Sequence, residues 1–431
     1  MSTSTSTSTG TSTSTGTGTS TGTGTRTRTV VTGLGITAPN GLGTEDYWRA
    51  TLAGESGIGP VTRFDASQYP SRIAGEVPGY TAEEHIPSRL LPQTDHMTRL
   101  ALTAADWALA DAGIDTSQLP EYGMGVVTSA SGGAVEFGQR ELENLWSKGK
   151  EYVSAYQSFA WFYAVNTGQI SIRHKMRGPS GVLLSEQAGG IDSIGQARRH
   201  VRKGFPVVVS GGVDAAVCPW GWVPQIASGL MSTEDDPARA FLPFAADASG
   251  YVPGEGGAIL VVEDAASARE RGAEHVYGEV AGYAATLDPA PGSGRPPGLR
   301  RAAENAIADA GLTPEDIDVV FADASGVPAL DRAEAEALTG LFGPYGVPVT
   351  APKSMTGRLL AGGAALDAAT ALLALRDGVI PPTAPVSEAA PEYQLDLVTG
   401  APRERELRSA LVLARGHGGF NAALVVRQPV P

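Results

Sequence analysis

Residues 178–203 form the unit that most constrains the fold: a short strand, a sharp turn and a helix. The apolar run from Val182 to Leu184 is typical of a short buried strand. Apolar or small side chains then recur at helical spacing at Ile191, Ile194, Ala197 and Val201. A strand that turns directly into a helix presents one side chain at the start of that helix.

The turn of this unit is built for a reactive group. Residues 188–190 are Ala-Gly-Gly, small enough for a backbone or a ligand to come close. A helix N-terminus favours an anion or a thiolate, so a nucleophile is expected there. The chain instead has Gln187, whose neutral amide cannot attack a thioester. The sequence therefore predicts a site for a nucleophile without the nucleophile.

The rest of the chain predicts an α/β protein. It has 431 residues, of which 42% are hydrophobic, enough for two large cores or one double-sized core. Segments with strand and helix patterns alternate in both halves, for example the helix expected over His96–Ala112 and the strand over residues 206–212. This alternation favours sheets that are covered by helices on both sides.

Charge and cysteine content exclude several classes of protein. A formal charge of −14 argues against a nucleic-acid partner. A local basic patch remains possible at Arg198, Arg199, Arg202 and Lys203, although a solvated helix face is the favoured interpretation. Cys218 is the single cysteine and is expected to be a buried, inert thiol in a reducing cytoplasm. No apolar run approaches the ~20 residues of a membrane span, and no signal-peptide pattern opens the chain.

The N-terminal segment and the first strand need separate interpretation. Residues 1–29 alternate Ser, Thr and Gly, which predicts a disordered tail without an assigned function. The strand from Val30 runs into Gly33-x-Gly35-x-x-Ala38, a weak form of a dinucleotide-binding motif. Glu55 has the spacing of the acidic residue of that motif, but it follows a helix instead of ending a strand. A nucleotide site is therefore disfavoured.

Several of these motifs together resemble one family. Ser-Glu-Gln-Ala-Gly-Gly at 185–190 is similar to the nucleophile elbow of β-ketoacyl synthases, with Gln187 in the position of cysteine. The glycine-rich turn and strand over 250–263 match the same family closely, and the opening strand at 30–41 is similar too. With glutamine at this position the chain resembles the chain length factors, or ketosynthase β subunits, of type II aromatic polyketide synthases. The resemblance runs from Val30 to about Arg427.

The resemblance implies an α/β, thiolase-like fold. Its two similar halves stack in a five-layer α-β-α-β-α arrangement. The expected division is a tail over 1–29, an N-terminal half over 30–264 and a C-terminal half over 265–428. The sequence itself shows no clear repeat between the halves.

The resemblance also implies that the catalytic residues are replaced. A condensing enzyme uses a thiolate and two imidazoles, and related enzymes add a lysine. Here Gln187 replaces the cysteine, Asp323 and Arg358 replace the two histidines, and Lys353 is retained. We expect Asp323 and Arg358 to pair and fill the old active site, with a separation of no more than ~6 Å. His417, in a glycine-rich loop, could restore proton transfer, although a structural role is favoured.

The implied role is that of a subunit of an acyltransferase complex. Such a subunit forms a heterodimer with a cysteine-bearing ketosynthase α subunit and shapes the tunnel in which the polyketide grows. Malonyl units and the growing thioester arrive on the phosphopantetheine arm of an acyl carrier protein, which is a carried substrate. The resemblance implies no tightly bound cofactor, no metal, and neither nucleic acid nor membrane as a partner.

Chain length would depend on side chains that close the tunnel. By position, the family gate corresponds to Val135, Gly138 and Leu142, which share one face of a helix expected over 135–146. Core packing explains Val135 and Leu142 equally well, but a helical glycine costs about 1 kcal/mol and needs a reason, such as an open tunnel. The modest size of these side chains predicts a long product. The aromatic run over 158–163 is expected in the core or at a subunit interface.

Two other functions remain open. The chain could be a structural half of the complex with no effect on length. It could also be a malonyl-carrier-protein decarboxylase that primes synthesis, with the Gln187 amide donating to the enolate oxygen. Decarboxylating relatives keep both histidines, whereas this chain has neither.

Overall fold

A computed structural model describes residues 27–290 and 292–429. Most of the expected disordered tail, residues 1–26, lies outside the described residues. The expected tail boundary at residue 29 is wrong, because Thr29 is the first residue of strand β1 and is fully buried. Arg28, just before it, lies with its Nε 3.2 Å from the Glu279 carboxylate.

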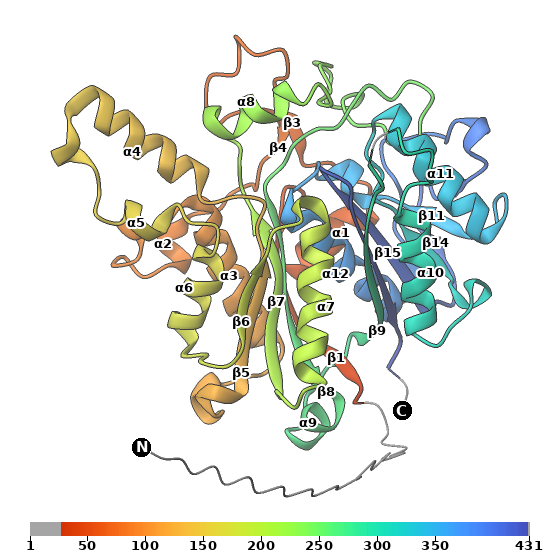
Figure 1. Ribbon diagram of the computed structural model, residues 1–431, viewed down its shortest axis with the longest axis horizontal. Helices are drawn as coiled ribbons and strands as arrows, with labels where there is room; N and C mark the ends of the chain where they lie inside the picture. Colours follow the sequence, from red (N-terminus) through yellow and green to blue (C-terminus); the bar gives the residue numbers. More distant parts are fainter. Residues whose placement is uncertain (1–26, 291, 430–431) are drawn as a thin grey trace, which may run out of the picture.

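The N-terminal half contributes five strands to the main path of the large sheet, in the order β6-β5-β7-β8-β1 (Figure 1). β5 runs parallel to β6 and β7, whereas β8 runs antiparallel to β7 and β1. β1, β5, β7 and nearly all of β8 are buried along their length, as expected for a sheet covered on both faces. The strands are β1 (Thr29–Ala38), β5 (Met124–Ser129), β6 (Ser180–Leu183), β7 (Val207–Asp214) and β8 (Gly256–Asp264).

The C-terminal half contributes six strands, in the order β9-β16-β15-β10-β11-β13. β16 pairs antiparallel with β9 and β15, and the remaining pairs are parallel. The strands are β9 (Gly278–Leu287), β10 (Val319–Phe321), β11 (Pro348–Thr350), β13 (Asp396–Leu397), β15 (Ser409–Gly416) and β16 (Phe420–Arg427). The two halves meet where β1 pairs with β9 through Val30–Glu279 and Val31–Gly278, so one continuous path of strands runs through the molecule.

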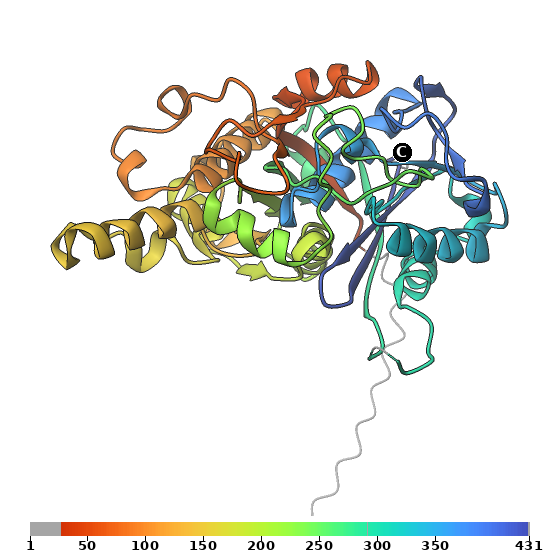
Figure 2. The same cartoon turned by 90° about the horizontal axis from the view of Figure 1, so that it is seen from above.

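The helices complete the five layers of the thiolase-like fold. α7 and α12 lie in the middle and contact strands of both halves, while α3 covers the outer face of the first half and α10 that of the second (Figures 1 and 2). α12 is buried over almost its whole circumference because its alanines, glycines and leucines make it apolar on nearly every side. The longer helices are α1 (Thr44–Leu52), α3 (His96–Asp111), α4 (Val135–Lys148), α6 (Val165–His174), α7 (Gly189–Val201), α8 (Pro219–Ala227), α10 (Leu299–Asp309), α11 (Pro328–Phe342) and α12 (Ala361–Asp377).

Shorter elements connect these layers. They are the helices α2 (Ala82–His85), α5 (Gln157–Ala160) and α9 (Ala265–Glu270), and the strands β2 (Gly41–Leu42), β3 (Ile58–Pro60), β4 (Ile73–Gly75), β12 (Val379–Ile380) and β14 (Arg403–Glu404). Within the described ranges, no helix is both long enough and apolar enough to cross a membrane.

The glycines of the weak dinucleotide motif have a packing role. Gly33 and Gly35 lie within β1 instead of at a turn. A Cβ at Gly33 would lie 2.1 Å from the Ala108 carbonyl oxygen of α3, and one at Gly35 would lie 1.9 Å from that of Ala104. These glycines allow the close approach of strand and helix, so their presence is explained by packing.

Candidate functional site

Gln187 lies where the sequence predicts a nucleophile, in a single 3-10 turn (Glu186–Ala188) that leads into α7. The side chain is 5% exposed. With the amide oriented to satisfy both of its ends, Nε2 donates to the Leu360 carbonyl oxygen at 3.0 Å and Oε1 accepts from the Leu360 N–H at 3.2 Å. Gln187 therefore joins the start of α7 to the residue that precedes α12.

The small residues after Gln187 serve the packing of the two central helices. A Cβ at Gly190 would lie 2.4 Å from the backbone nitrogen of Ala365 in α12. A Cβ at Gly189 would lie 3.0 Å from the Ser129 side chain at the end of β5. The Ala-Gly-Gly sequence predicts a close neighbour, and the structure shows two. Gly190 lies against the backbone of α12, and Gly189 lies against the side chain of Ser129.

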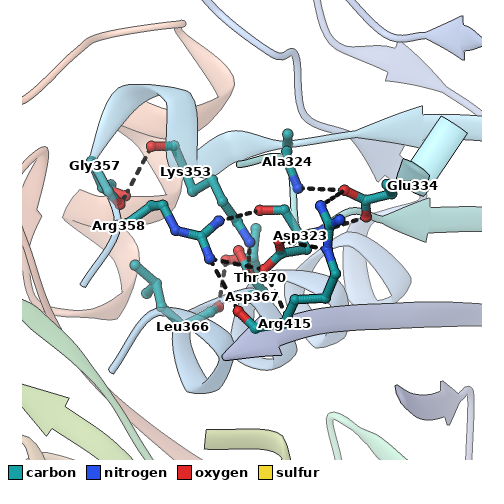
Figure 3. Close-up of polar contacts among 12 residues, drawn as sticks. Asp323, Ala324, Glu334, Lys353, Gly357, Arg358, Leu366, Asp367, Thr370 and Arg415 are labelled. Atoms are coloured by element: carbon teal, nitrogen blue, oxygen red, sulfur yellow. Dashed lines mark hydrogen bonds and ion pairs between the residues drawn. The ribbon is translucent and has the colours of Figure 1, made fainter. Parts of the chain in front are cut away.

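Asp323 and Arg358 form an ion pair, which confirms the expected contact (Figure 3). The Arg358 Nη2 lies 3.1 Å from the Asp323 carboxylate, and Nη1 donates to the Asp323 carbonyl oxygen at 3.0 Å. Both residues are almost fully buried, at 1% and 8% exposure. Asp323 follows the end of β10, and Arg358 lies in the loop between β11 and α12. The pair therefore joins the segments that follow two adjacent strands.

The ion pair belongs to a larger buried network. Arg415, on β15, donates from its backbone N–H and from Nε to the Asp323 carboxylate at 2.9 and 3.1 Å. Its Nη2 contacts Glu334 of α11 at 3.0 Å. Glu334 also accepts the backbone N–H groups of Asp323 and Ala324, at 2.7 and 2.9 Å. Asp323, Glu334, Arg358 and Arg415, here called the four-residue network, alternate in charge and satisfy one another (Figure 3).

The electrostatics of this network depend on its cations. Burial alone would raise the pKa of Asp323, but Arg358, Arg415 and Lys353 hold that pKa well below its usual value. Burial raises the pKa of Glu334, against the opposing effect of Arg415. Asp323 is therefore a permanently charged carboxylate, and it offers no proton to a substrate near neutral pH.

Lys353 lies beside the four-residue network but forms its ion pair with a residue outside that network. Its ammonium group lies 2.7 Å from the Asp367 carboxylate of α12, and both side chains are buried. Burial raises the pKa of Asp367, while Lys353 lowers it. The retained lysine therefore has a carboxylate partner inside the fold (Figure 3).

His417 lies at the surface, in the turn between β15 and β16. Its backbone N–H donates to the Glu186 carboxylate at 2.8 Å. The neighbouring Gly416 packs against the Gln187 turn, since a Cβ there would lie 2.2 Å from the Ser185 carbonyl oxygen. The glycine-rich loop thus holds the turn by backbone contacts, as a structural role for His417 would require.

Cys218 offers no alternative nucleophile. Its side chain is 5% exposed, and burial raises the pKa of the thiol to about 11. In the described ranges no group of three or more His, Cys, Asp or Glu side chains is placed to hold a metal ion. The predicted site therefore holds a buried amide at Gln187 and a buried pair of opposite charges at Asp323 and Arg358.

Glu334, Asp367 and Arg415 were missed by the sequence analysis. Arg415 directly follows the apolar run 411–414, and a charge at the end of a buried strand is an informative signal. Glu334 lies four residues from both Leu330 and Leu338, on what would be the apolar face of a helix. Asp367 interrupts an otherwise apolar helix in the same way.

The three residues predicted to form the gate lie on α4, which projects from the body of the molecule (Figures 1 and 2). Val135 is half-buried, Gly138 is buried and Leu142 is 39% exposed. A Cβ at Gly138 would lie 2.6 Å from the Trp220 ring, so an indole fills the space that the sequence analysis expected to be an open tunnel. Leu142 and Trp220 line an open hollow of about 330 Å³ together with Gln139, Glu143 and Trp146.

Two surface features also differ from their simplest interpretation. The aromatic run 158–163 is not core in this chain, because Phe159, Trp161, Phe162 and Tyr163 are 38–46% exposed. The basic patch is reduced, because Arg198 is 4% exposed and its Nη1 forms an ion pair with Asp309. Arg199 covers the Tyr283 ring, with its guanidinium carbon 5.3 Å from the ring centre.

Comparison with known proteins agrees with the fold. The family profile described as "Beta-ketoacyl synthase, N-terminal domain" matches residues 26–268, and "Beta-ketoacyl synthase, C-terminal domain" matches residues 277–387. The ketoacyl synthase β subunit of the tetracenomycin polyketide synthase from Streptomyces glaucescens is 62% identical over 400 residues, which cover 93% of this chain and 98% of the relative.

Solved structures give the same result. The ishigamide ketosynthase/chain length factor has a TM-score of 0.85 at 29% identity, covering 94% of this chain and 100% of the other. A β-ketoacyl synthase from Burkholderia phymatum has a TM-score of 0.86 at 25% identity, with the same coverage. The chain therefore belongs to the β-ketoacyl synthase family, in its ketosynthase β or chain length factor branch.

Proposed function

We propose that this chain is the non-condensing subunit of a type II polyketide synthase. It pairs with a cysteine-bearing ketosynthase α subunit and sets the length of the polyketide by shaping the elongation tunnel. The observation that carries this proposal is the buried pairing of Asp323 with Arg358 next to a fixed Gln187. The similarity to the tetracenomycin synthase β subunit supports the same role.

The replaced residues remove each chemical step of condensation. Gln187 occupies the position of the thiolate that would take the acyl chain. Asp323 and Arg358 occupy the positions of the two imidazoles that would polarise the malonyl thioester and stabilise the enolate. In this proposal Lys353 keeps its family position but is neutralised by Asp367, 2.7 Å away. Bond formation is thus left to the partner.

Decarboxylation through Gln187 is the weaker alternative. That mechanism needs the amide N–H groups to point at an enolate oxygen, with imidazoles nearby to assist. One amide N–H is instead engaged by the Leu360 carbonyl oxygen, and the amide oxygen by the Leu360 N–H. The supporting imidazoles are replaced by the network of Asp323 and Arg358.

Length control is assigned to α4. A chain that grows inside a tunnel stops when side chains at the end of the tunnel block it, so the size of the gate sets the length. Val135, Gly138 and Leu142 face one side of α4, and Leu142 borders the open hollow beside Trp220. The tunnel would be completed when the partner covers this surface. Because Trp220 occupies the space beside Gly138, its ring is a fourth determinant of the gate.

The remaining partners follow from this role. Malonyl units and the growing thioester are delivered by the phosphopantetheine arm of an acyl carrier protein, which is a substrate arm and no resident cofactor. The division into halves at 30–264 and 265–428 is retained as a proposal, with the β1–β9 pairing as the junction. The single buried thiol of Cys218 suits a protein of the reducing cytoplasm.

Turnover of malonyl-carrier protein tests the proposal. The purified chain alone should release no carbon dioxide above the buffer rate, and the chain together with its ketosynthase should form a polyketide. Gln187→Ala in the pair should leave the condensation rate within a few-fold of wild type. Decarboxylation by the chain alone that is abolished by Gln187→Ala would establish a priming enzyme instead.

A further inference from the structure

The gate helix α4 begins without a capping side chain of its own. Its N-cap residue is Ala134, which provides no side-chain acceptor for the free N–H groups of the first turn. The helix then extends from the body of the molecule, and its second half is largely exposed (Figure 2). The position of its first turn must therefore be set by residues from elsewhere in the chain.

Asp95 supplies the missing cap from another helix. One of its carboxylate oxygens accepts the Met97 N–H at 2.9 Å and caps α3. The other accepts the Phe137 N–H of α4 at 2.7 Å. Asp95 is 3% exposed, so one buried carboxylate fixes the first turns of both helices relative to each other.

A second contact holds the same turn. Arg63 lies 2.6 Å from the Glu136 carboxylate of α4 and 3.7 Å from that of Glu255. Glu255 directly precedes β8 and is 1% exposed. Its carboxylate accepts the Val77 N–H at 3.1 Å and lies 3.1 Å from the His96 ring nitrogen. The first turn of α4 is thereby joined through Arg63 to a fixed point in the sheet.

We propose that Asp95 and the Arg63–Glu136 ion pair are positioning residues for the gate. Phe137, whose N–H Asp95 accepts, is adjacent to Gly138, so a small rotation of the first turn would move Val135 and Gly138 relative to the Trp220 ring. The uniformity of product length would then depend on residues that touch neither the growing chain nor the gate side chains. This inference rests on the proposed function, because it assumes that α4 ends the tunnel.

Asp95→Asn removes one of the two contacts of this carboxylate. An asparagine oxygen caps a helix about as well as aspartate, but asparagine has only this one acceptor atom. It can accept the Met97 N–H or the Phe137 N–H but not both, so the shared cap that fixes α3 relative to α4 is lost. With the complete complex of this chain, its ketosynthase and the acyl carrier protein, the ratio of off-length to parent-length products should rise about tenfold, as measured by mass spectrometry.

Two further variants keep the test decisive. Asp264→Asn is the matched control, because Asp264 caps α9 through the Ser267 N–H at 2.9 Å and lies on a different element from α4. It should leave the length distribution unchanged. Glu136→Gln removes only the ion pair with Arg63 at a half-exposed position, and should broaden the distribution even if Asp95→Asn fails to assemble.

The outcomes distinguish the positioning role of Asp95 and Glu136 from the proposed control of length by α4. A wild-type distribution of lengths in Asp95→Asn and Glu136→Gln, from assembled and folded complexes, would overturn the positioning role. If in the same assay Gly138→Phe shifts the length, the assignment of the gate survives that failure. If Gly138→Phe also leaves the length unchanged, the assignment of length control to α4 is wrong as well. A fall in total product with an unchanged distribution would indicate a merely structural role for Asp95.

Discussion

At the scale of single residues, the inactive site is a filled site. In the proposed assignment, Asp323 and Arg358 stand in the positions of two catalytic imidazoles, and they hold opposite charges 3.1 Å apart. Arg415 and Glu334 satisfy the remaining hydrogen-bonding groups, so the buried charges are compensated. Under the proposed assignment, these charges belong to the internal scaffold of the fold.

Arg358→Met should destabilise the protein strongly. It leaves the buried Asp323 with Arg415 as its ion-pair partner, and breaking a buried pair costs about 3–5 kcal/mol. We expect the lower end of this range, and a fall of several degrees in the melting temperature. Arg408→Met is the control, because its ion pair with Glu406 is 75% exposed on both sides and should contribute little. Equal melting temperatures for the two variants would contradict a buried, coupled network.

Asp331 should make stability depend on pH. It is fully buried, accepts the N–H groups of Phe244 and Gly326 at 2.8 and 3.0 Å, and burial raises its pKa to about 7. A carboxyl group with a raised pKa stabilises the fold at low pH, and this contribution is lost as pH rises through the folded pKa. Between pH 5 and 7 the loss is about 2–3 kcal/mol.

The variant Asp331→Asn tests this pH dependence. Because asparagine does not titrate, the wild-type melting temperature should exceed that of the variant most at pH 5, and the gap should narrow towards pH 7. Well above the pKa of Asp331 the gap should be constant. A difference in melting temperature that is the same at every pH would show that Asp331 does not titrate in this range.

At this scale the sequence predicts replacements better than it predicts their surroundings. Alignment of motifs finds Gln187, Asp323, Arg358 and Lys353, because each lies in a recognisable local pattern. The charges that complete the network come from other elements: Glu334 of α11 is 11 residues from Asp323, and Arg415 of β15 is 92 residues from it. Their partners depend on the packing of those elements, which no local pattern specifies.

At the scale of elements, the position of α4 is proposed to set the length of the polyketide. Gly138→Phe puts an aromatic ring where a Cβ would already lie 2.6 Å from Trp220. The added ring must displace the indole or project into the space beside it, so the polyketide should be shorter by one or more two-carbon units. Mass spectrometry of the product made with the ketosynthase partner measures this change.

Ser147→Phe is the control for that variant. Ser147 lies on the exposed second half of α4, and its hydroxyl donates to the Glu143 carbonyl oxygen at 2.5 Å. The substitution adds the same ring to the same helix away from Gly138, and should leave the length unchanged. If both variants shorten the product equally, the effect is not specific to the gate.

The success of sequence periodicity varied among the elements. The helix from His96 and the Ala-rich helix near 359–375 were located to within two residues at each end, because their apolar or small residues continue unbroken. α11 was missed because two of its four buried side chains, Asp331 and Glu334, are acidic, and this removes the apolar stripe. Apolar periodicity thus fails to predict a helix where the buried side chains are charged residues that bind other polar groups.

At the scale of the whole molecule, the site lies where the two halves meet. Gln187 lies in the turn that leads into α7 of the first half, while Asp323, Arg358 and Arg415 come from the second half. The Gln187 amide forms hydrogen bonds with the backbone of Leu360, the residue before α12. Composition and alternation of elements predict an α/β protein. The five layers followed from family resemblance, since the sequence shows no repeat, and the single strand path through β1 and β9 was not anticipated.

The length of the polyketide made by one ketosynthase with different β subunits tests the central claim most directly. The same ketosynthase and carrier protein are combined first with this chain and then with a related β subunit whose product has a different length. The account predicts that the carbon number changes with the β subunit and that neither β subunit alone consumes malonyl-carrier protein. A carbon number that stays constant, fixed by the ketosynthase, would contradict it and leave this chain a structural half of the complex.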